Sequence, residues 1–304
     1  MAKSLAAATV LLLLPACRTP DHGGPFAGPF DAGTMAEPRN QEASGLAVSR
    51  RAANLLWIHE DSGRAPELHA LDEHGARRGR ILVAGAENID WEDVASFTLE
   101  GRAWLCVADV GDNNAQRPFV QLHFIEEPDP TLLSPDQELT LRPTFSLQVS
   151  YEDGPRDCES VAVDARERAV YLLSKRDAVP RLYRVPLAAA ARPVVARKVG
   201  EAPHFPKPNQ VQRVLKIPTG LYRASPCAMD FAADGSGAVV LTYGDTLYFP
   251  RATGESWPTA LAREPVVLGG HGLLQAEAVA FARDGRSIFV CSEGTMRLLR
   301  YDRR

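Results

Sequence analysis

The sequence lacks the features that mark several common classes of protein. It carries 38 acidic and 34 basic residues, a net charge of −4 at pH 7, so it has no basic excess with which to bind nucleic acid. It contains no His-Glu-x-x-His pair for a catalytic zinc, no Gly-x-Ser-x-Gly turn and no phosphate-cradling glycine loop. Its cysteines fit no zinc-site spacing. We therefore expect no nucleic-acid partner and none of these chemistries.

The N-terminus has the pattern of a secretion signal. Lys3 supplies a positive charge, and the apolar run that follows ends at Leu14, far short of the ~20 residues that cross a bilayer. The four residues ending at Cys17 resemble the bacterial lipobox, although Pro15 departs from the usual small residue. We expect residues 1–16 to be a lipoprotein signal peptide and Cys17 to be lipidated. The alternative is an ordinary signal with an incidental cysteine.

Residues 17–41 are expected to form a flexible, lipid-anchored tether. They are rich in Pro and Gly and show no apolar periodicity. Two acyl chains on Cys17 would make the membrane a stable partner of the protein. Arg18 stands where some bacteria place the aspartate that retains lipoproteins in the inner membrane. We therefore expect a bacterial cell-envelope location, in the outer membrane rather than the inner.

One unit recurs along residues 42–304. Three copies share the register Glu-x-Val-Ala and begin at Glu92, Glu159 and Glu277, and weaker copies begin at Ser44 and Cys227. The last two copies continue to an Asp-Gly pair between alternating apolar runs, which is typical of a β-hairpin. Successive copies begin 48, 67, 68 and 50 residues apart, compared with ~40–50 residues for one propeller blade.

The repeat predicts an all-β fold, a β-propeller of five blades, two of which carry insertions. The last copy has room for only three strands, so a segment around Phe30–Met35 should supply the fourth and close the ring. Six blades, with a degenerate unit in residues 201–224, is the alternative, and a sandwich fits a repeated template less well. The expected first strands are 44–48, 92–97, 159–164, 227–232 and 277–282.

A propeller would gather certain polar side chains at one mouth of its central channel. First strands line the axis, and the start of a first strand lies beside the end of the second. Carboxylates dominate these positions, and their oxygens suit a hard cation such as calcium or an acid–base pair. We expect metal ligands at Asp90, Glu92, Asp109, Asp112 and Glu159, and ligand-binding side chains at His59, Asp61, Asn113, Lys175, Arg176 and Glu277.

Several of these positions have a second interpretation. The run 109–114 suits a calcium loop, but an Asx-rich turn that caps its own backbone fits equally well. Lys175 and Arg176 could bind a phosphate or carboxylate of a ligand, or could pair with neighbouring carboxylates to reduce repulsion. Cys158 and Cys227 lie in or beside neighbouring first strands, and an oxidising compartment would permit a disulfide between them.

Four segments carry a family resemblance: Glu42–Ala47, Trp57–Gly63, Asp90–Ala95 and Asp109–Asn113. Together they resemble a group of secreted bacterial β-propellers related in fold to phytase-like and gluconolactonase-type propellers. The resemblance extends over roughly residues 42–302 and implies a propeller with calcium in its central funnel. The Asp-Asp-Pro-Ala signature of the phytases is absent, so the resemblance implies the fold and calcium but not phytase activity.

Two functions fit these expectations. In the first, a lipid-anchored envelope propeller binds a small-molecule or protein ligand at an acidic, calcium-binding mouth. In the second, the mouth belongs to a calcium-dependent hydrolase of a phosphate ester or lactone, whose metal-activated water needs no nucleophile–base pair. A purely structural role in the envelope is the third possibility.

Overall fold

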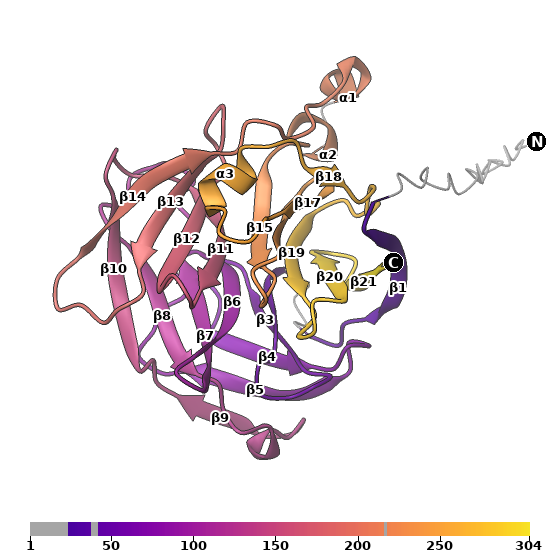
Figure 1. The fold of residues 1–304 in the computed structure, drawn as a ribbon. Coiled ribbons are helices and arrows are strands. Elements are labelled where there is room, and N and C mark those ends of the chain that lie inside the picture. The colour runs from indigo at the N-terminus through magenta and orange to yellow at the C-terminus, as the bar shows by residue number, and fades with distance from the viewer. Residues whose placement is uncertain (1–23, 38–41, 216–217) are drawn as a thin grey trace, which may run out of the picture.

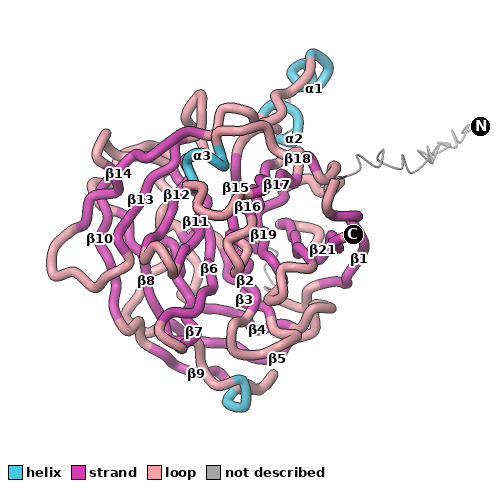
Figure 2. The backbone as a smooth tube through the Cα atoms, viewed as in Figure 1, coloured by secondary structure: helices cyan, strands magenta, loops and turns pink. Residues whose placement is uncertain are grey.

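Five strands form the inner wall of the fold, and each lies where the repeat predicts a first strand (Figure 1). Each of them contacts the next and the last contacts the first, so they form a closed ring. From each inner strand, three further strands follow outward by antiparallel pairing. This is the arrangement of a β-propeller, and strands and loops make up most of the tube in Figure 2. The inner strands are β2 (Ala43–Val48), β6 (Trp91–Leu99), β11 (Cys158–Asp164), β15 (Pro226–Phe231) and β19 (Ala276–Phe281).

The computed structural model describes residues 24–37, 42–215 and 218–304. The expected signal peptide and Cys17 lie outside these ranges. Four of the four-stranded units, called sheets here, are completed by strands that follow their inner strand along the chain: β3 (Leu56–Glu60), β4 (Glu67–Leu71) and β5 (Arg77–Val83); β7 (Arg102–Asp109), β8 (Val120–Glu126) and β10 (Phe145–Tyr151); β12 (Ala169–Ser174), β13 (Arg181–Pro186) and β14 (Val194–Glu201); β16 (Gly237–Thr242), β17 (Thr246–Pro250) and β18 (Val266–Val267). The outer strands β10 and β14 pair in parallel, so the second and third units are continuous at their edges.

The fifth sheet joins the two ends of the described chain. Beyond β19 it contains β20 (Ser287–Ser292), β21 (Arg297–Arg303) and, at its outer edge, β1 (Phe26–Thr34). The expected closing strand around residue 30 is thus confirmed. β1 lies inside the range 17–41 expected to be a tether, so the boundary at residue 42 was placed too late. The bounds of β1 were not evident in the sequence, because it is a Gly-containing edge strand whose register shifts twice against β21.

Insertions account for the two long intervals of the repeat. In the second sheet, the chain between β8 and β10 forms a 3-10 turn (Pro130–Leu132) and β9 (Glu138–Leu141), which pairs in parallel with β5. Between β14 and β15 it forms α1 (Gln210–Leu215) and α2 (Pro218–Leu221), and the described residues there contain no further strand of a sixth unit. A third helix, α3 (Trp257–Leu261), follows β17. Across the described ranges, no helix is long and apolar enough to cross a membrane.

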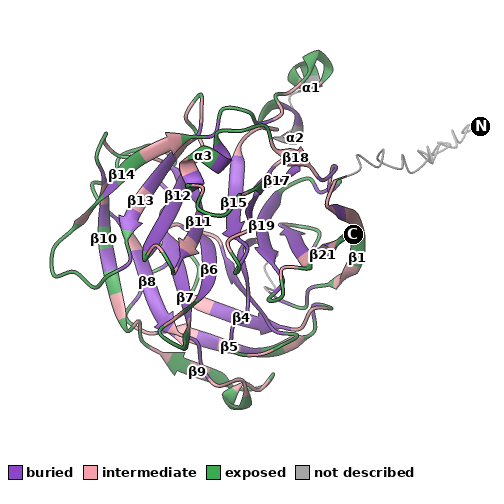
Figure 3. Cartoon of the chain, viewed as in Figure 1, coloured by how far each residue is buried: buried purple, intermediate pink, exposed green. Residues whose placement is uncertain are grey.

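Apolar side chains fill the spaces between adjacent sheets. Five buried clusters each join two neighbours around the ring; in one, Phe124 of β8 packs with Leu172 of β12 and Tyr183 of β13. β2, β15 and β19 are buried along their whole length. In Figure 3, the buried strand β15 contrasts with β10, along which buried residues alternate with intermediate and exposed ones. Inner strands are covered on both faces, so only the outer strands show the two-residue period.

Candidate functional site: an acidic mouth

A register shift of the β-bulge kind lies at the start of all five inner strands, and in β2 it falls between Ala43 and Leu46. In β6, the pairing with β7 shifts by one residue at Glu92. The same shift falls at Glu159 in β11, at Cys227 in β15 and at Glu277 in β19. These are the residues that open each copy of the repeat. A bulge leaves one residue without a partner and re-aims its side chain, which allows these side chains to converge at one end of the ring.

The bulged residues and the adjoining loops form a continuous acidic mouth. The described residues contain three groups in which one donor atom of each residue lies within 4.8 Å of the others. Glu92 belongs to two of the groups, and Glu159 also belongs to two, so the groups are linked side by side. They draw on residues of all five sheets. The groups are Asp61–Asp90–Glu92, Glu92–Asp157–Glu159 and Glu159–Cys227–Glu277.

Burial and mutual repulsion raise the pKa values of these carboxyl groups. Glu92 is 7% exposed, and burial, followed by repulsion from Glu159 and Asp61, raises its pKa well above the ordinary value. Burial raises the pKa of Asp90 to about 6, with Asp61 adding repulsion. Burial raises the pKa of Glu159 to about 8, although Lys175 opposes the shift. A mouth of this kind is most stable when it holds protons or a cation.

Lys175 supplies one positive charge to part of the mouth. Its Nζ pairs with Glu159, donates a hydrogen bond of 3.0 Å to the Tyr243 hydroxyl and lies 4.8 Å from the centre of the Tyr243 ring. Burial acts to lower the pKa of Lys175, but Cys227, Glu159 and Glu277 outweigh it and raise the pKa. Lys175 is therefore a charged, internally paired residue, and the group around Cys227 already has its counter-charge.

The loop that follows β7 is held by its own backbone. The two carboxylate oxygens of Asp112 accept hydrogen bonds from the backbone N–H groups of Gln116 at 2.9 Å and Arg117 at 2.8 Å. Asp109 pairs with the guanidinium of Arg117 at 2.8 Å and accepts a hydrogen bond from the Asp90 N–H. Neither carboxylate belongs to the three acidic groups found among the described residues. The contacts favour the Asx-turn interpretation of residues 109–114.

Three residues expected to bind a ligand have protein partners or are buried. Nε of Arg176 pairs with Asp157 at 2.5 Å, and the same guanidinium donates to the side-chain oxygen of Asn113. His59 is fully buried and lies edge-on to Trp91, with 5.6 Å between the ring centres. Burial lowers the pKa of His59, so the ring is neutral at pH 7. The contacts of Arg176 therefore favour the interpretation that it pairs with a neighbouring carboxylate. His59 lies below the mouth rather than on its surface.

Two members of the mouth were not among the ligands expected from the sequence. Asp157 stands two positions before Glu159, as Asp90 stands two before Glu92, so the repeat contained a signal for it. Cys227 occupies a position that is Glu in three other copies. Cys158 and Cys227 are both free and buried, so the suggested disulfide is absent. The reason is geometric: the Cys158 side chain packs in the core between the second and third sheets, away from the mouth.

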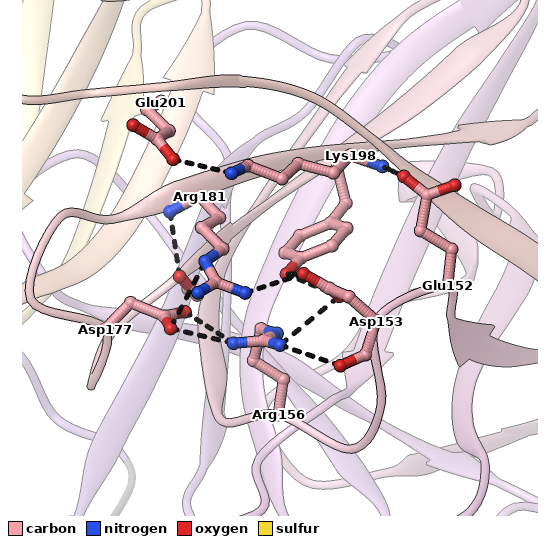
Figure 4. Close-up of polar contacts among 9 residues, drawn as sticks. Glu152, Asp153, Arg156, Asp177, Arg181, Lys198 and Glu201 are labelled. Carbon is pink, nitrogen blue, oxygen red and sulfur yellow. Dashed lines mark hydrogen bonds and ion pairs between the residues drawn. The ribbon is translucent and has the colours of Figure 1, made fainter.

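An ion-pair network connects the two loops of the third sheet that lead into the mouth (Figure 4). Nη1 of Arg156, in the loop before β11, lies 2.7 Å from Asp177, in the loop after β12. Nη1 of Arg181 lies 2.6 Å from Asp153, which also accepts a hydrogen bond of 2.9 Å from the Tyr183 hydroxyl. The network fixes one loop against the other, and these loops carry Asp157 and Lys175.

An open cleft of about 640 Å³ adjoins the mouth on the side of the fourth sheet. Tyr243 lines this cleft while its hydroxyl contacts Lys175, so one side chain belongs to both. The ion pair of Arg223 and Asp245, 2.7 Å apart, and the glycine-rich segment 269–274 form other parts of its wall. A ligand in the cleft would therefore approach the mouth through Tyr243.

The fold and the mouth together define an all-β propeller with an acidic, lysine-containing site at the bulged ends of its inner strands. No family model matches the sequence, and no curated protein matches it. Among solved structures, a gluconolactonase from Xanthomonas campestris is similar at 11% identity and a TM-score of 0.44, over 92% of this chain and 98% of that one. Hydrazine synthase from Kuenenia stuttgartiensis is similar at 12% identity and a TM-score of 0.43, over 86% of this chain and 71% of that one. The WD40 domain of Pan2 from Neurospora crassa is similar at 6% identity and a TM-score of 0.36, over 86% of this chain and 63% of that one.

Proposed function

We propose that this chain is a lipid-anchored, five-bladed β-propeller of the bacterial cell envelope, whose acidic mouth binds calcium together with a small-molecule or protein ligand. The closed ring of inner strands supports five blades, and the lipobox-like residues ending at Cys17 support the anchor. The observation that carries the binding function is the group Asp61, Asp90 and Glu92, whose carboxylate oxygens lie within 4.8 Å of one another. An all-oxygen donor set suits a hard cation such as calcium.

This group is also the one with the fewest competing partners. Among the described residues, the carboxylates of Asp90 and Glu92 pair with no hydrogen-bond donor, and Asp61 accepts only the N–H of the next residue. By contrast, Glu159 is paired with Lys175. Carboxylates that lie this close together and lack hydrogen-bond donors repel one another at a cost in free energy, and a bound cation would remove that cost. Because the pKa values of Asp90 and Glu92 are raised, calcium binding should release protons.

A hydrolase is the second candidate, and the unequal pKa values favour it. Asp90, with a pKa of about 6, could accept a proton, while Glu159, with a pKa of about 8, could donate one. Calcium held by the neighbouring carboxylates would polarise a phosphoryl or carbonyl oxygen of the substrate. The cleft beside Tyr243 offers room for a phosphate ester or a lactone. Activity on a panel of such compounds that is lost with chelator would establish this function.

Thermal unfolding of chelator-stripped protein tests calcium binding. A ligand that binds only the folded state adds about 2.7 kcal/mol of stability at a hundredfold excess over its Kd, so saturating calcium should raise the Tm by several degrees. Glu92→Gln should remove most of this rise. Asp234→Ala, in a turn on the opposite face, should keep it. A Tm that does not respond to calcium would mean that protons and Lys175 neutralise the mouth without a metal.

The anchor is tested separately by cell fractionation. Cys17→Ser should make the protein extractable from membranes by a high-salt, alkaline wash, because it removes both acyl chains, the attachment expected to survive such a wash. If the Cys17→Ser protein resists the alkaline wash as strongly as the native protein does, lipid attachment at this residue is wrong.

A further inference from the structure

The segment between β14 and β15 forms a projecting arm, defined here as residues 203–215 and 218–224. It contains α1 and α2, and α1 stands clear of the sheets (Figure 1). Four large apolar side chains of the arm are exposed, and Val211 and Val214 are 66% and 74% exposed. The other two are Leu221 and Tyr222. Exposed apolar residues concentrated on one short segment indicate a contact surface rather than chance exposure.

The arm also differs in charge from the rest of the chain. Between Glu201 and Asp230 the sequence contains four Lys or Arg residues and no Asp or Glu, although the whole chain has a net charge of −4. Lys207 and Arg213 are exposed on the arm. A projecting segment that combines exposed apolar and cationic side chains is complementary to a surface with anionic groups above an apolar layer.

The arm lies beside the place where the chain enters the fold. The wall of the cleft next to the mouth includes Gln212 of the arm and Leu274, which is 67% exposed. Val267 and Gly269 line the same cleft, and Gly24, where the described chain begins, packs against Val266 and Leu268. Six residues lie between Cys17 and Gly24, so a lipid on Cys17 is at most ~25 Å of chain from this point.

We propose that the arm is a membrane-contact element that binds an anionic lipid bilayer. Val211, Val214, Leu221 and Tyr222 enter the boundary between headgroups and acyl chains, while Lys207 and Arg213 pair with lipid phosphates. The inference extends the proposed lipid anchoring, since the anchor and the arm meet the same membrane. Because Tyr243 lines the cleft beside the arm, the arm also sets how the mouth faces the bilayer. Binding by the arm itself does not require the lipid on Cys17.

Vesicle sedimentation with the Cys17→Ser protein tests the arm without the anchor. The protein should bind phosphatidylcholine vesicles that contain phosphatidylglycerol, and bind vesicles of phosphatidylcholine alone or in high salt more weakly. Each basic residue near such a surface contributes about fivefold in affinity, so Lys207→Glu with Arg213→Glu should weaken binding at least tenfold. Val211→Ser with Val214→Ser should also weaken it. In Val214→Trp, tryptophan emission should shift to the blue when anionic vesicles are added.

Matched surface variants provide the control. Arg78→Glu with Arg192→Glu changes two exposed cations outside the arm, and Leu132→Ser removes an exposed apolar residue elsewhere; both should leave vesicle binding unchanged. The proposal is overturned if the Cys17→Ser protein binds no vesicles, or if the arm variants bind as well as the parent. It is also overturned if the arm variants lose only a protein partner. None of these results bears on whether the native protein is anchored through Cys17, which fractionation decides.

Discussion

The carboxylate of Asp93 accepts a hydrogen bond of 2.8 Å from the backbone N–H of Val161, so a side chain of β6 is bonded to the main chain of β11. The other contacts of this carboxylate are with the N–H groups of Val94 and Met229, at 2.9 and 3.3 Å. Asp93 is completely buried, and burial raises its pKa well above the ordinary value. It therefore acts as a structural bridge on the axis of the ring, below the mouth.

Asp93→Ala should lower the free energy of unfolding by about 3 kcal/mol, because it leaves buried N–H groups without an acceptor. Urea denaturation measures the change. Asp136→Ala, at an exposed loop position, is the control and should change stability by less than about 0.5 kcal/mol. Equal effects of the two substitutions would contradict the bridging role of Asp93.

Lys175→Met should destabilise the protein by about 3 kcal/mol at pH 8, since it leaves buried acidic groups without their counter-charge. The loss should be smaller at pH 5, where Glu159 is protonated in either protein. Adding Glu159→Gln to Lys175→Met should recover part of the stability lost by the single variant. A double-mutant cycle in urea measures the coupling, and strictly additive effects would show that the two residues do not interact.

Stability of the calcium-free protein should fall as pH rises from about 4 to 8. An acid whose pKa is raised on folding binds more protons in the folded state, so its contribution is largest below the unfolded pKa and is lost as pH rises through the folded pKa. Asp90, Glu293 and Glu159 have pKa values raised to about 6, 7 and 8, all with burial as the main cause. The Tm of chelated protein across this range measures the fall, and Glu92→Gln should reduce it. A Tm that rises over the same range would contradict the raised pKa values.

Asp153→Ala should cost about 1–2 kcal/mol, because it removes partners from Arg181, Arg156 and the Tyr183 hydroxyl in the network of Figure 4. Glu201→Ala, which breaks only an exposed pair with Lys198, should cost less than about 0.5 kcal/mol. Thermal unfolding distinguishes the two. If both substitutions changed stability by a similarly small amount, the ion pairs of Asp153 would be as weak as the exposed pair of Glu201 and Lys198.

The first strands and their hairpins could be predicted from the sequence because these features are local. Short alternating runs and Asp-Gly turns depend on the two-residue period of a strand and on a glycine with positive φ, as at Gly235 and Gly285. The repeat also identified Glu92, Glu159 and Glu277 as equivalent, and the structure brings all three to one mouth. The closing position of β1 followed from the shortage of strands in the last copy.

The tertiary structure decided which partners each polar side chain has. Asp112 and Glu92 look alike in sequence as acidic loop or strand-end residues. Asp112 nevertheless caps its own loop, whereas no hydrogen-bond donor among the described residues reaches the carboxylate of Glu92 at its bulge. The side chain of Asp93, one position further along, does not belong to the mouth. Its carboxylate accepts hydrogen bonds from backbone N–H groups of two other sheets. Sequence spacing fixes which strand a residue occupies. Only the closure of the ring determines which donors and charges from other sheets come within hydrogen-bonding distance, because those contacts join residues far apart in the chain.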